Sequence, residues 1–166
     1  MPRQPQSNLA VRQAENSDLA GIMRLQAASY TPALQEPESM FAQILKISAG
    51  TCFIAESEAT VAGYLLTHPV PDDYTTFGKG IPELQGNETT LYIHDLCVGP
   101  DFRGRGVAQL LLNTLKSTFN EQGKIKTFLG VAVQNSESFW AAQGFTIGKP
   151  YIYPGGSSGF VMTHKV

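Results

Sequence analysis

The chain has 166 residues, of which 42% are hydrophobic, and this suits one compact domain with a sizeable core rather than a disordered chain. Its 12 basic and 14 acidic side chains nearly balance, so the composition favours neither nucleic acid nor an anionic membrane as a partner. No apolar run approaches the ~18 residues of a membrane span, and residues 1–8 lack the apolar core of a signal peptide. We therefore expect a cytoplasmic protein without membrane contact.

The first part of the chain predicts a strand, two helices and a hairpin. Asn16 or Ser17 can cap the first helix, which ends at Tyr30, and Gly50 can end the second. Only four residues separate the next two apolar segments, so we expect them to pair as a hairpin. In chain order, the expected elements are a strand at 9–12, a helix to residue 30, a helix at about 38–47, and strands at 51–56 and 61–67.

A long loop is expected from His68 to Thr90, where three prolines and three glycines interrupt any regular pattern. Loops of this length are often functional, and this one leads directly into the next apolar strand. His68, within this loop, and His164, near the C-terminal end, are expected to lie at the surface.

The second part of the chain predicts a further alternation of helices and strands. Gly123 is expected to close the helix after residue 106, whose apolar side chains recur every four residues at Val107, Leu111, Leu115 and Phe119. The continuous apolar segment 127–133 is typical of a central strand that is covered on both faces. A short helix at 136–143 and strands at 145–153 and 160–163 complete a single mixed α/β domain.

The segment 91–108 is the most informative in the chain, because it combines a buried strand, a turn and a helix start suited to an anion. Gly104 and Gly106 leave space where a ligand can approach the backbone, and the next helix offers free N–H groups at its positive end. Arg103 and Arg105 supply two cations for a pyrophosphate. The alternative is an ordinary turn with a flexible helix entry. The spacing fits neither the P-loop nor the dinucleotide fingerprint.

This segment also matches a family pattern. The run Arg103-Gly104-Arg105-Gly106-Val107-Ala108 fits the Gln/Arg-x-x-Gly-x-Gly/Ala signature of the GCN5-related N-acetyltransferase (GNAT) family, which the chain resembles from about residue 8 to 166. The resemblance implies one domain over residues 1–166 with the GNAT fold. That fold has a central, mostly antiparallel sheet with a splayed parallel strand pair and about four flanking helices. The resemblance also implies acetyl-CoA as the cosubstrate, with the signature loop around its pyrophosphate.

The resemblance extends to both sides of the signature loop. Strand residues 96–98 correspond to family positions that meet the pantetheine arm, and segment 136–145 resembles the Asn-x-x-Ala-x-x-Phe-Tyr-x-x-x-Gly-Phe block. In that block the usual asparagine is missing, and Asn135 is expected to take its role from a shifted position. The cofactor-binding residues implied by the resemblance are Leu96, Cys97, Val98, Arg103, Gly104, Arg105, Gly106, Val107, Ala108, Asn135 and Trp140.

Trp140 stands where many family members carry a tyrosine that protonates the departing CoA thiolate. An indole N–H donates a hydrogen bond but has no accessible acid pKa, so Trp140 can contact the sulfur without protonating it. Packing in the core beneath the cofactor is the alternative role for Trp140. Tyr151 or Tyr153 is the alternative acid, unless the thiolate leaves without one.

The proton acceptor is expected in the strand before the signature loop. Attack on a thioester needs a neutral amine, and histidine is the side chain that titrates near neutral pH without a large shift. Period-two alternation places Tyr92, His94 and Leu96 on one face of the strand, and Ile93 and Asp95 on the other. Arylalkylamine acetyltransferases, which this strand resembles, carry imidazoles at the positions of Tyr92 and His94, and these two residues are the catalytic candidates. The alternatives are a half-buried His94 without a chemical role, or proton transfer through water.

The expected function is direct transfer of an acetyl group from acetyl-CoA to a primary amine of a small molecule or peptide, without an acyl-enzyme. The helix pair at 30–47, with Tyr30, Glu36 and Glu38, and the loop 71–90 are expected to shape the acceptor site. The two carboxylates can attract a cation, and the alternative is that they are ordinary solvated acids on a helix face. A non-catalytic acyl-CoA-binding sensor with the same fold is the alternative, and an acyl chain longer than acetyl is a second one.

The remaining expectations concern metals, thiols and assembly. Cys52 and Cys97 lie within apolar segments, which predicts two buried, reduced thiols. The spacing of His, Cys, Asp and Glu suggests no metal site, and a homodimer is compatible with the sequence.

Overall fold

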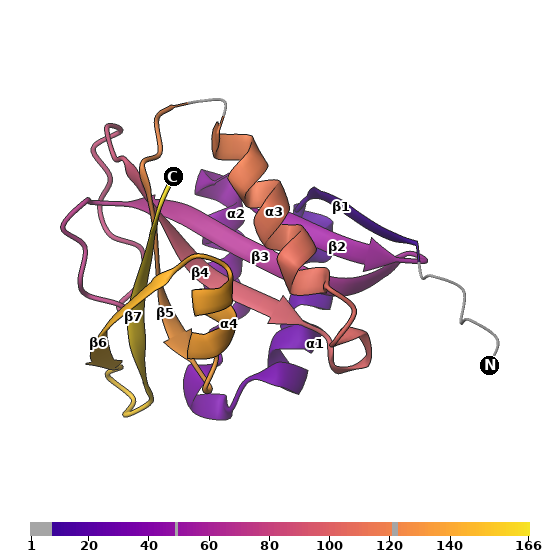
Figure 1. Cartoon of the computed structure of the whole chain (residues 1–166). Helices are drawn as coiled ribbons and strands as arrows, with labels where there is room; N and C mark the ends of the chain where they lie inside the picture. The colour runs from indigo at the N-terminus through magenta and orange to yellow at the C-terminus, as the bar shows by residue number, and fades with distance from the viewer. Residues whose placement is uncertain (1–7, 49, 121–122) are drawn as a thin grey trace.

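The computed structural model describes residues 8–48, 50–120 and 123–166, so the signal-peptide prediction for residues 1–8 lies almost wholly outside the described residues. The described residues form a seven-stranded sheet and four α-helices (Figure 1). In chain order these are β1 (Leu9–Gln13), α1 (Leu19–Ser29), α2 (Glu38–Ile47), β2 (Phe53–Ser57), β3 (Thr60–Val70), β4 (Thr90–Val98), α3 (Val107–Asn120), β5 (Thr127–Val133), α4 (Glu137–Ala142), β6 (Thr146–Ile152) and β7 (Ser158–Lys165).

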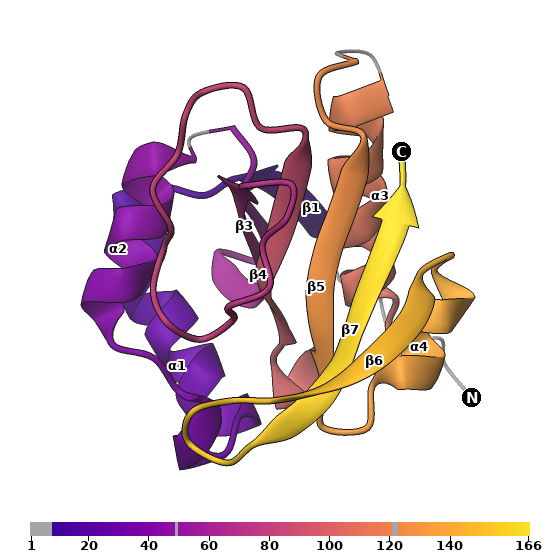
Figure 2. The same cartoon turned by 90° about the vertical axis from the view of Figure 1, so that its left-hand side faces the viewer.

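The sheet has the strand order β1-β2-β3-β4-β5-β7-β6, and its neighbouring strands are antiparallel except for β4 and β5. Helices α1 and α2 cover one face, and α3 and α4 cover the other (Figure 2). This arrangement confirms the predicted mixed sheet with one parallel strand pair and flanking helices. Within the described residues, none of the helices combines the length and the apolar character needed to cross a bilayer.

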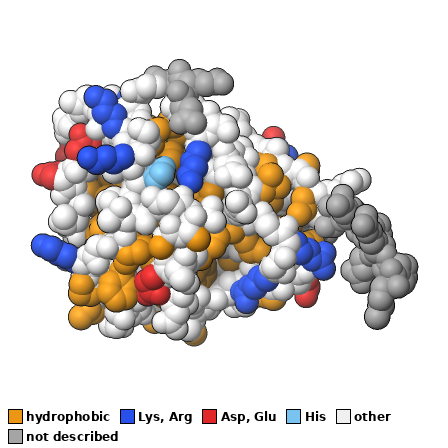
Figure 3. Space-filling view, in the orientation of Figure 1, with side chains coloured by type: hydrophobic (Ala, Val, Ile, Leu, Met, Phe, Trp, Pro, Cys, Tyr) orange, Lys and Arg blue, Asp and Glu red, His pale blue; other side chains and the backbone are white. Residues whose placement is uncertain are grey.

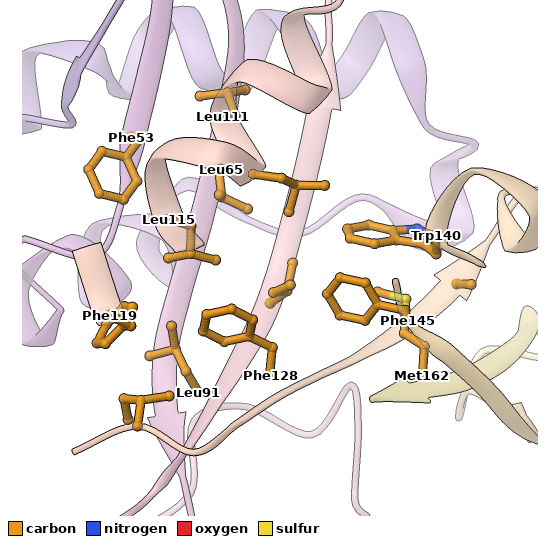
Figure 4. Packing of buried hydrophobic residues seen from close by; sticks show 14 of the residues in the cluster. Phe53, Leu65, Leu91, Leu111, Leu115, Phe119, Phe128, Trp140, Phe145 and Met162 are labelled. Atoms are coloured by element: carbon orange, nitrogen blue, oxygen red, sulfur yellow. The ribbon is translucent and has the colours of Figure 1, made fainter. Parts of the chain in front are cut away.

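Each face of the sheet carries its own hydrophobic core. The predicted stripe of α3 is at most 5% exposed and packs on β-strand residues such as Leu65 and Phe128 (Figure 4). On the opposite face, α1 and α2 bury Ile22 and Phe41 against Tyr64 of β3. The role predicted for Gly123 in closing α3 falls partly outside the described residues, because residues 121–122 are not described.

The start of α1 differs from the prediction, because neither Asn16 nor Ser17 caps it. A short 3₁₀ turn at Asn16–Asp18 precedes the helix. The carboxylate of Asp18 accepts a hydrogen bond from the backbone N–H of Glu15 at 2.7 Å and two from the guanidinium of Arg12 at 2.8 Å. The charge-assisted hydrogen bonds from Arg12 favour Asp18 at the start of α1 over a neutral side chain such as Asn16 or Ser17.

Strand β3 is longer than predicted, and the surface position predicted for His68 is wrong. The strand runs to Val70, and the side chain of His68 is 1% exposed. Pro69 is tolerated because β2 pairs with β3 only as far as Leu65, so at Pro69 one side of β3 has no partner strand that needs an N–H. The expected loop therefore shortens to residues 71–89.

The thiols and the surface agree with the composition. Cys52 and Cys97 are buried and not joined in a disulfide, which confirms their predicted burial. Burial raises the pKa of each thiol to about 11, so neither forms a thiolate near neutral pH. On the surface, basic and acidic side chains are interspersed over the face seen in Figure 3, in keeping with the balanced composition.

Candidate active site

Strands β4 and β5 separate after three residues of parallel pairing. Residues 90–92 pair with residues 127–129, and the described residues show no pairing beyond them. The separation opens into a cavity of about 660 Å³, with β4 as one wall and residues of β5, α4 and the α1–α2 connection around it. The free edge of β4 therefore offers backbone amide groups to a ligand.

A β-bulge lies in β4 at His94. Consecutive residues of β3 pair with Ile93 and Asp95, which leaves His94 as the extra residue. The predicted alternation therefore holds for Tyr92 and His94, which share a face, but it is wrong for Asp95 and Leu96. Asp95 turns to the same face as His94, where it meets Tyr64, whereas Leu96 packs against the α3 core. The bulge places two ionisable side chains in succession at the cavity wall.

The signature loop at one end of the cavity has the geometry expected of an anion site. Gly104 and Gly106 have φ angles of 75° and 78°, and a Cβ at either position would meet no atom within 4 Å. The first backbone hydrogen bond of α3 runs from the N–H of Leu110 to the carbonyl of Gly106 at 3.0 Å. Among the described residues, none accepts a hydrogen bond from the N–H groups of residues 104–108. These donors are free to bind an anion.

Most of the residues assigned to the cofactor come together here. Those that line the main cavity are Leu96, Cys97, Val98, Arg103, Ala108 and Trp140, while Gly104, Gly106 and Val107 line an adjoining depression. Two residues lie elsewhere. The guanidinium of Arg105 lies 5.6 Å from the ring centre of Phe102, and Asn135 is exposed outside the cavity, in a left-handed conformation with φ of 60°. Its neighbours Gln134 and Ser136 line the cavity instead.

At the other end of the cavity, three ionisable side chains form a chain of hydrogen bonds. Nε2 of His94 lies 2.8 and 2.9 Å from the two carboxylate oxygens of Glu36, which precedes α2. Nδ1 of His94 lies 3.0 Å from Nε2 of His68 on β3. His68 in turn contacts the carbonyl oxygen of Pro69 at 3.0 Å through Nδ1. His94 thus sits between a carboxylate and a second imidazole.

Asp95 forms a second cluster beside this chain. The phenols of Tyr30 and Tyr64 donate hydrogen bonds to its two carboxylate oxygens at 2.5 and 2.7 Å. Burial desolvates the carboxylate and raises the pKa of Asp95 to about 6, although the hydrogen bonds from both phenols lower it. Burial first, and then the charge of Asp95, hold the pKa of both phenols well above the ordinary tyrosine value.

The second catalytic candidate, Tyr92, lines the cavity within an aromatic cluster. The ring of Tyr92 stacks on Phe77 and makes a T-shaped contact with the ring of His68. Burial raises the pKa of Tyr92 well above the ordinary value, so its phenol stays protonated near neutral pH. Of the alternative acids, Tyr153 lines the cavity and burial raises its pKa to about 12. Tyr151 lies away from the cavity lining and donates its hydroxyl to the carbonyl of Phe77 at 2.8 Å.

Trp140 belongs to the core and to the cavity wall at the same time. It is 6% exposed, and its ring packs edge-on against Phe139. It also packs edge-on against Phe145, which lies beside it in Figure 4. Among the described residues we find no hydrogen-bond partner for its indole N–H. The position is compatible with packing under a ligand and with a hydrogen bond to it.

Three residues of this site were missed by the sequence reasoning, namely His68, Asp95 and Tyr64. The proline after His68 reads as the start of a loop, and the bulge that turns Asp95 inward leaves no mark in the sequence. Tyr64 lies in an apolar strand, where a tyrosine is ordinary core. The sequence offered one cue, because a half-buried histidine in a strand needs a hydrogen-bond partner. Glu36 was predicted to shape the acceptor site, but not to bind His94.

Comparison with known proteins agrees with this geometry. Residues 19–145 match the sequence model of the Acetyltransferase (GNAT) family. The chain belongs to this family. A comparison of this GNAT protein with curated proteins gives no significant match.

Solved structures share the GNAT fold of the chain at low sequence identity. The GphF GNAT-like decarboxylase in complex with isobutyryl-CoA has a TM-score of 0.80 and 15% identity, covering 94% of this chain and 98% of that one. An Arabidopsis thaliana protein in complex with the bisubstrate analogue CoA-Ac-MVNAL has a TM-score of 0.73 and 15% identity, covering 95% and 99%. The GNAT family N-acetyltransferase YhbS from Escherichia coli in complex with CoA has a TM-score of 0.69 and 18% identity, covering 99% and 85%.

Proposed function

We propose that this GNAT protein is an acetyl-CoA-dependent N-acetyltransferase that acts directly on a primary amine of a small molecule or peptide. One observation carries the proposal. A continuous cavity runs from Arg103, beside the free N–H groups of the signature loop, past the unpaired edge of β4, to the Glu36–His94 pair. An anionic cofactor and a basic group therefore face the same space.

The residues at the loop end fit acetyl-CoA. Open space above Gly104 and Gly106 allows close approach to the backbone, and Arg103 adds a cation for the pyrophosphate. Residues 96–98 of β4 lie on the edge that has no strand partner. The carbonyls of Leu96 and Val98 accept hydrogen bonds from Tyr30 and Arg103, and the remaining backbone groups there can pair with an extended pantetheine arm. Solved neighbours with CoA or isobutyryl-CoA bound support this assignment. When bound, acetyl-CoA supplies the acetyl thioester that an amine attacks.

The opposite end of the cavity suits a cationic acceptor. Glu36 is 34% exposed there, and Asp95 lies deeper in the wall. Of the described residues that line the cavity, Arg103 is the one basic side chain besides the imidazole of His94, and it lies at the cofactor end. A protonated amine is therefore favoured over a carboxylate-bearing acceptor at this end. In this proposal His94 and Glu36 take a proton from the amine, and their direct contact supports that role.

Two measurements test the function. Calorimetric titration of the purified protein with acetyl-CoA should give selective micromolar binding, with ATP and NAD as controls that do not bind. Incubation with acetyl-CoA and a panel of polyamines, aryl amines, amino acids and peptide N-termini should then release free CoA and form an acetylated amine. Selective binding without transfer to any amine would favour the acyl-CoA sensor instead. Absence of binding would refute the cofactor assignment.

A further inference from the structure

The buried imidazole of His68 carries its hydrogen on a defined nitrogen. Its Nδ1 faces the carbonyl oxygen of Pro69, which only accepts hydrogen bonds, so Nδ1 must be the protonated nitrogen. Burial, and then the neighbouring His94, lower the pKa of His68 to about 4. The ring is therefore neutral near neutral pH, and its Nε2 carries a lone pair.

The lone pair on Nε2 of His68 determines which ring nitrogen of His94 carries a hydrogen. Nε2 of His68 and Nδ1 of His94 lie 3.0 Å apart, and one of the two must donate. Because Nε2 of His68 has no hydrogen, Nδ1 of His94 carries it. Nε2 is then the nitrogen of His94 that is left to gain or lose a proton.

The contact between Glu36 and Nε2 of His94 requires a further proton. A carboxylate oxygen and an unprotonated ring nitrogen are both acceptors, and they would repel each other at the observed 2.8 Å. The observed contact therefore contains one shared proton, held by His94 or by Glu36. The side chain of His94 is only 9% exposed, whereas that of Glu36 is 34% exposed. The carboxylate is the member of the pair that a ligand in the cavity meets first.

We propose that Glu36 and His94 act as one proton-accepting unit, in which Glu36 binds the acceptor ammonium directly and His68 is a positioning residue that keeps the hydrogen on Nδ1 of His94. This inference rests on the proposed N-acetyltransferase function. An ammonium that donates to Glu36 replaces the shared proton, which leaves to solvent. One N–H bond of the ammonium then breaks, its electron pair stays on nitrogen, and the proton passes to the Glu36–His94 unit. The neutral amine that results can attack.

Other ionisable groups surround the unit, and one of them, Asp95, titrates at mildly acidic pH. Tyr92 on β4, Tyr74 in the loop and Tyr153 after β6 stay protonated, because burial raises the pKa of each phenol above its ordinary value. Asp95, next to His94 on β4, has a pKa of about 6. An Asp95→Asn variant therefore has to accompany any pH profile, so that its titration can be subtracted.

The proton positions can be measured without any enzymatic activity. Nitrogen NMR of the full chain with isotope-labelled histidine reports which ring nitrogen carries hydrogen. We expect a neutral His68 protonated on Nδ1, and a His94 that keeps hydrogen on Nδ1, so that any change in its protonation occurs at Nε2. A His68 protonated on Nε2, or a His94 without hydrogen on Nδ1, would overturn the proposal.

Kinetics of matched variants test the roles. His68→Gln keeps an acceptor that Nδ1 of His94 can reach, whereas His68→Leu removes it. We expect kcat near neutral pH to fall roughly tenfold or more in His68→Leu and to recover in His68→Gln, with acetyl-CoA affinity unchanged in both. Glu36→Gln should lower kcat/KM for the amine about 100-fold and leave a rate that rises with pH as the free amine deprotonates. Unfolding midpoints of all variants are measured first.

The outcomes separate the inference from the function beneath it. Equal rates in His68→Leu and His68→Gln, or an unchanged pH profile in Glu36→Gln, would overturn the proposed roles. If the wild-type protein binds acetyl-CoA but acetylates no amine, the proposed function fails. The NMR spectra still decide the proton chain in that case.

Discussion

The phenol oxygen of Tyr64 lies 2.7 Å from Oδ2 of Asp95. The pKa of this Asp95 carboxyl group lies well above its ordinary value, although the hydrogen bond from Tyr64 lowers it. The pKa of Asp95 is about 6, above the ordinary value of 3.8, mainly because the surrounding protein desolvates the carboxylate. A group whose pKa is raised by folding stabilises the protein below its unfolded pKa and loses that contribution as pH rises through the folded pKa. The contribution of Asp95 to the free energy of unfolding should therefore fall as the pH rises from about 4 to about 7.

The Asp95→Asn variant makes this effect measurable, because asparagine does not titrate. We expect the unfolding free energy of the wild type, relative to the variant, to fall by about 1–3 kcal/mol between pH 4 and pH 7. The measurement is urea unfolding followed by circular dichroism at several pH values. Asp72→Asn is the control, since hydrogen bonds from Thr89 and Thr90 lower the pKa of Asp72 and its pH effect has the opposite sign. A pH-independent difference for Asp95→Asn would contradict the expectation.

A side chain at Gly106 should block the cofactor. Gly106→Ala places a methyl group in the open space above the signature loop and also costs about 1 kcal/mol, because φ is positive there. Gly86→Ala has the same backbone cost and also points into open space, but it lies in the loop before β4. Calorimetry should show acetyl-CoA affinity reduced tenfold or more, about 1.4 kcal/mol, in Gly106→Ala and unchanged in Gly86→Ala. Equal affinity in the two variants would remove the signature loop from the cofactor site.

The ion pair between Arg12 and Asp18 should stabilise the N-terminal strand and helix. The Arg12 guanidinium lowers the pKa of Asp18, whose side chain is 6% exposed. A group with a lowered pKa contributes stability above its unfolded pKa and loses it as pH falls. Asp18→Asn should therefore lower the unfolding free energy by about 1–2 kcal/mol at pH 7 and by less near pH 3. The same substitution in an Arg12→Gln background should have a smaller effect, and an equal effect would show that the pair contributes nothing.

Much of the fold followed from patterns that are local in the sequence. The stripe of α3 repeats every four residues, the hairpin of β2 and β3 has a short connection, and β5 is continuously apolar, so each element was predicted within a few residues. The signature loop was also predictable, because glycine and arginine at these positions have few other uses. In each case the determining interactions lie within about 20 residues of one another.

The proton chain at the other end of the cavity was not predictable in this way. His68 and His94 are adjacent only because β3 pairs with β4, and the bulge between Ile93 and Asp95 changes which side chains share a face. Both features depend on tertiary pairing, which a single-strand period cannot reveal. Glu36 reaches His94 from the α1–α2 connection, 58 residues earlier in the chain.

Trp140 should act by packing rather than by proton transfer. Its indole cannot protonate a thiolate, and its ring packs between Phe139 and Phe145 in the core beside the cavity. Trp140→Phe should cost about 1–3 kcal/mol of stability and change kcat at saturating substrates by less than about threefold. Phe145→Leu, in the same cluster, is the matched control for lost packing. If kcat fell about 100-fold in Trp140→Phe, with acetyl-CoA affinity intact and no such fall in Phe145→Leu, the indole N–H would have to stabilise the departing sulfur.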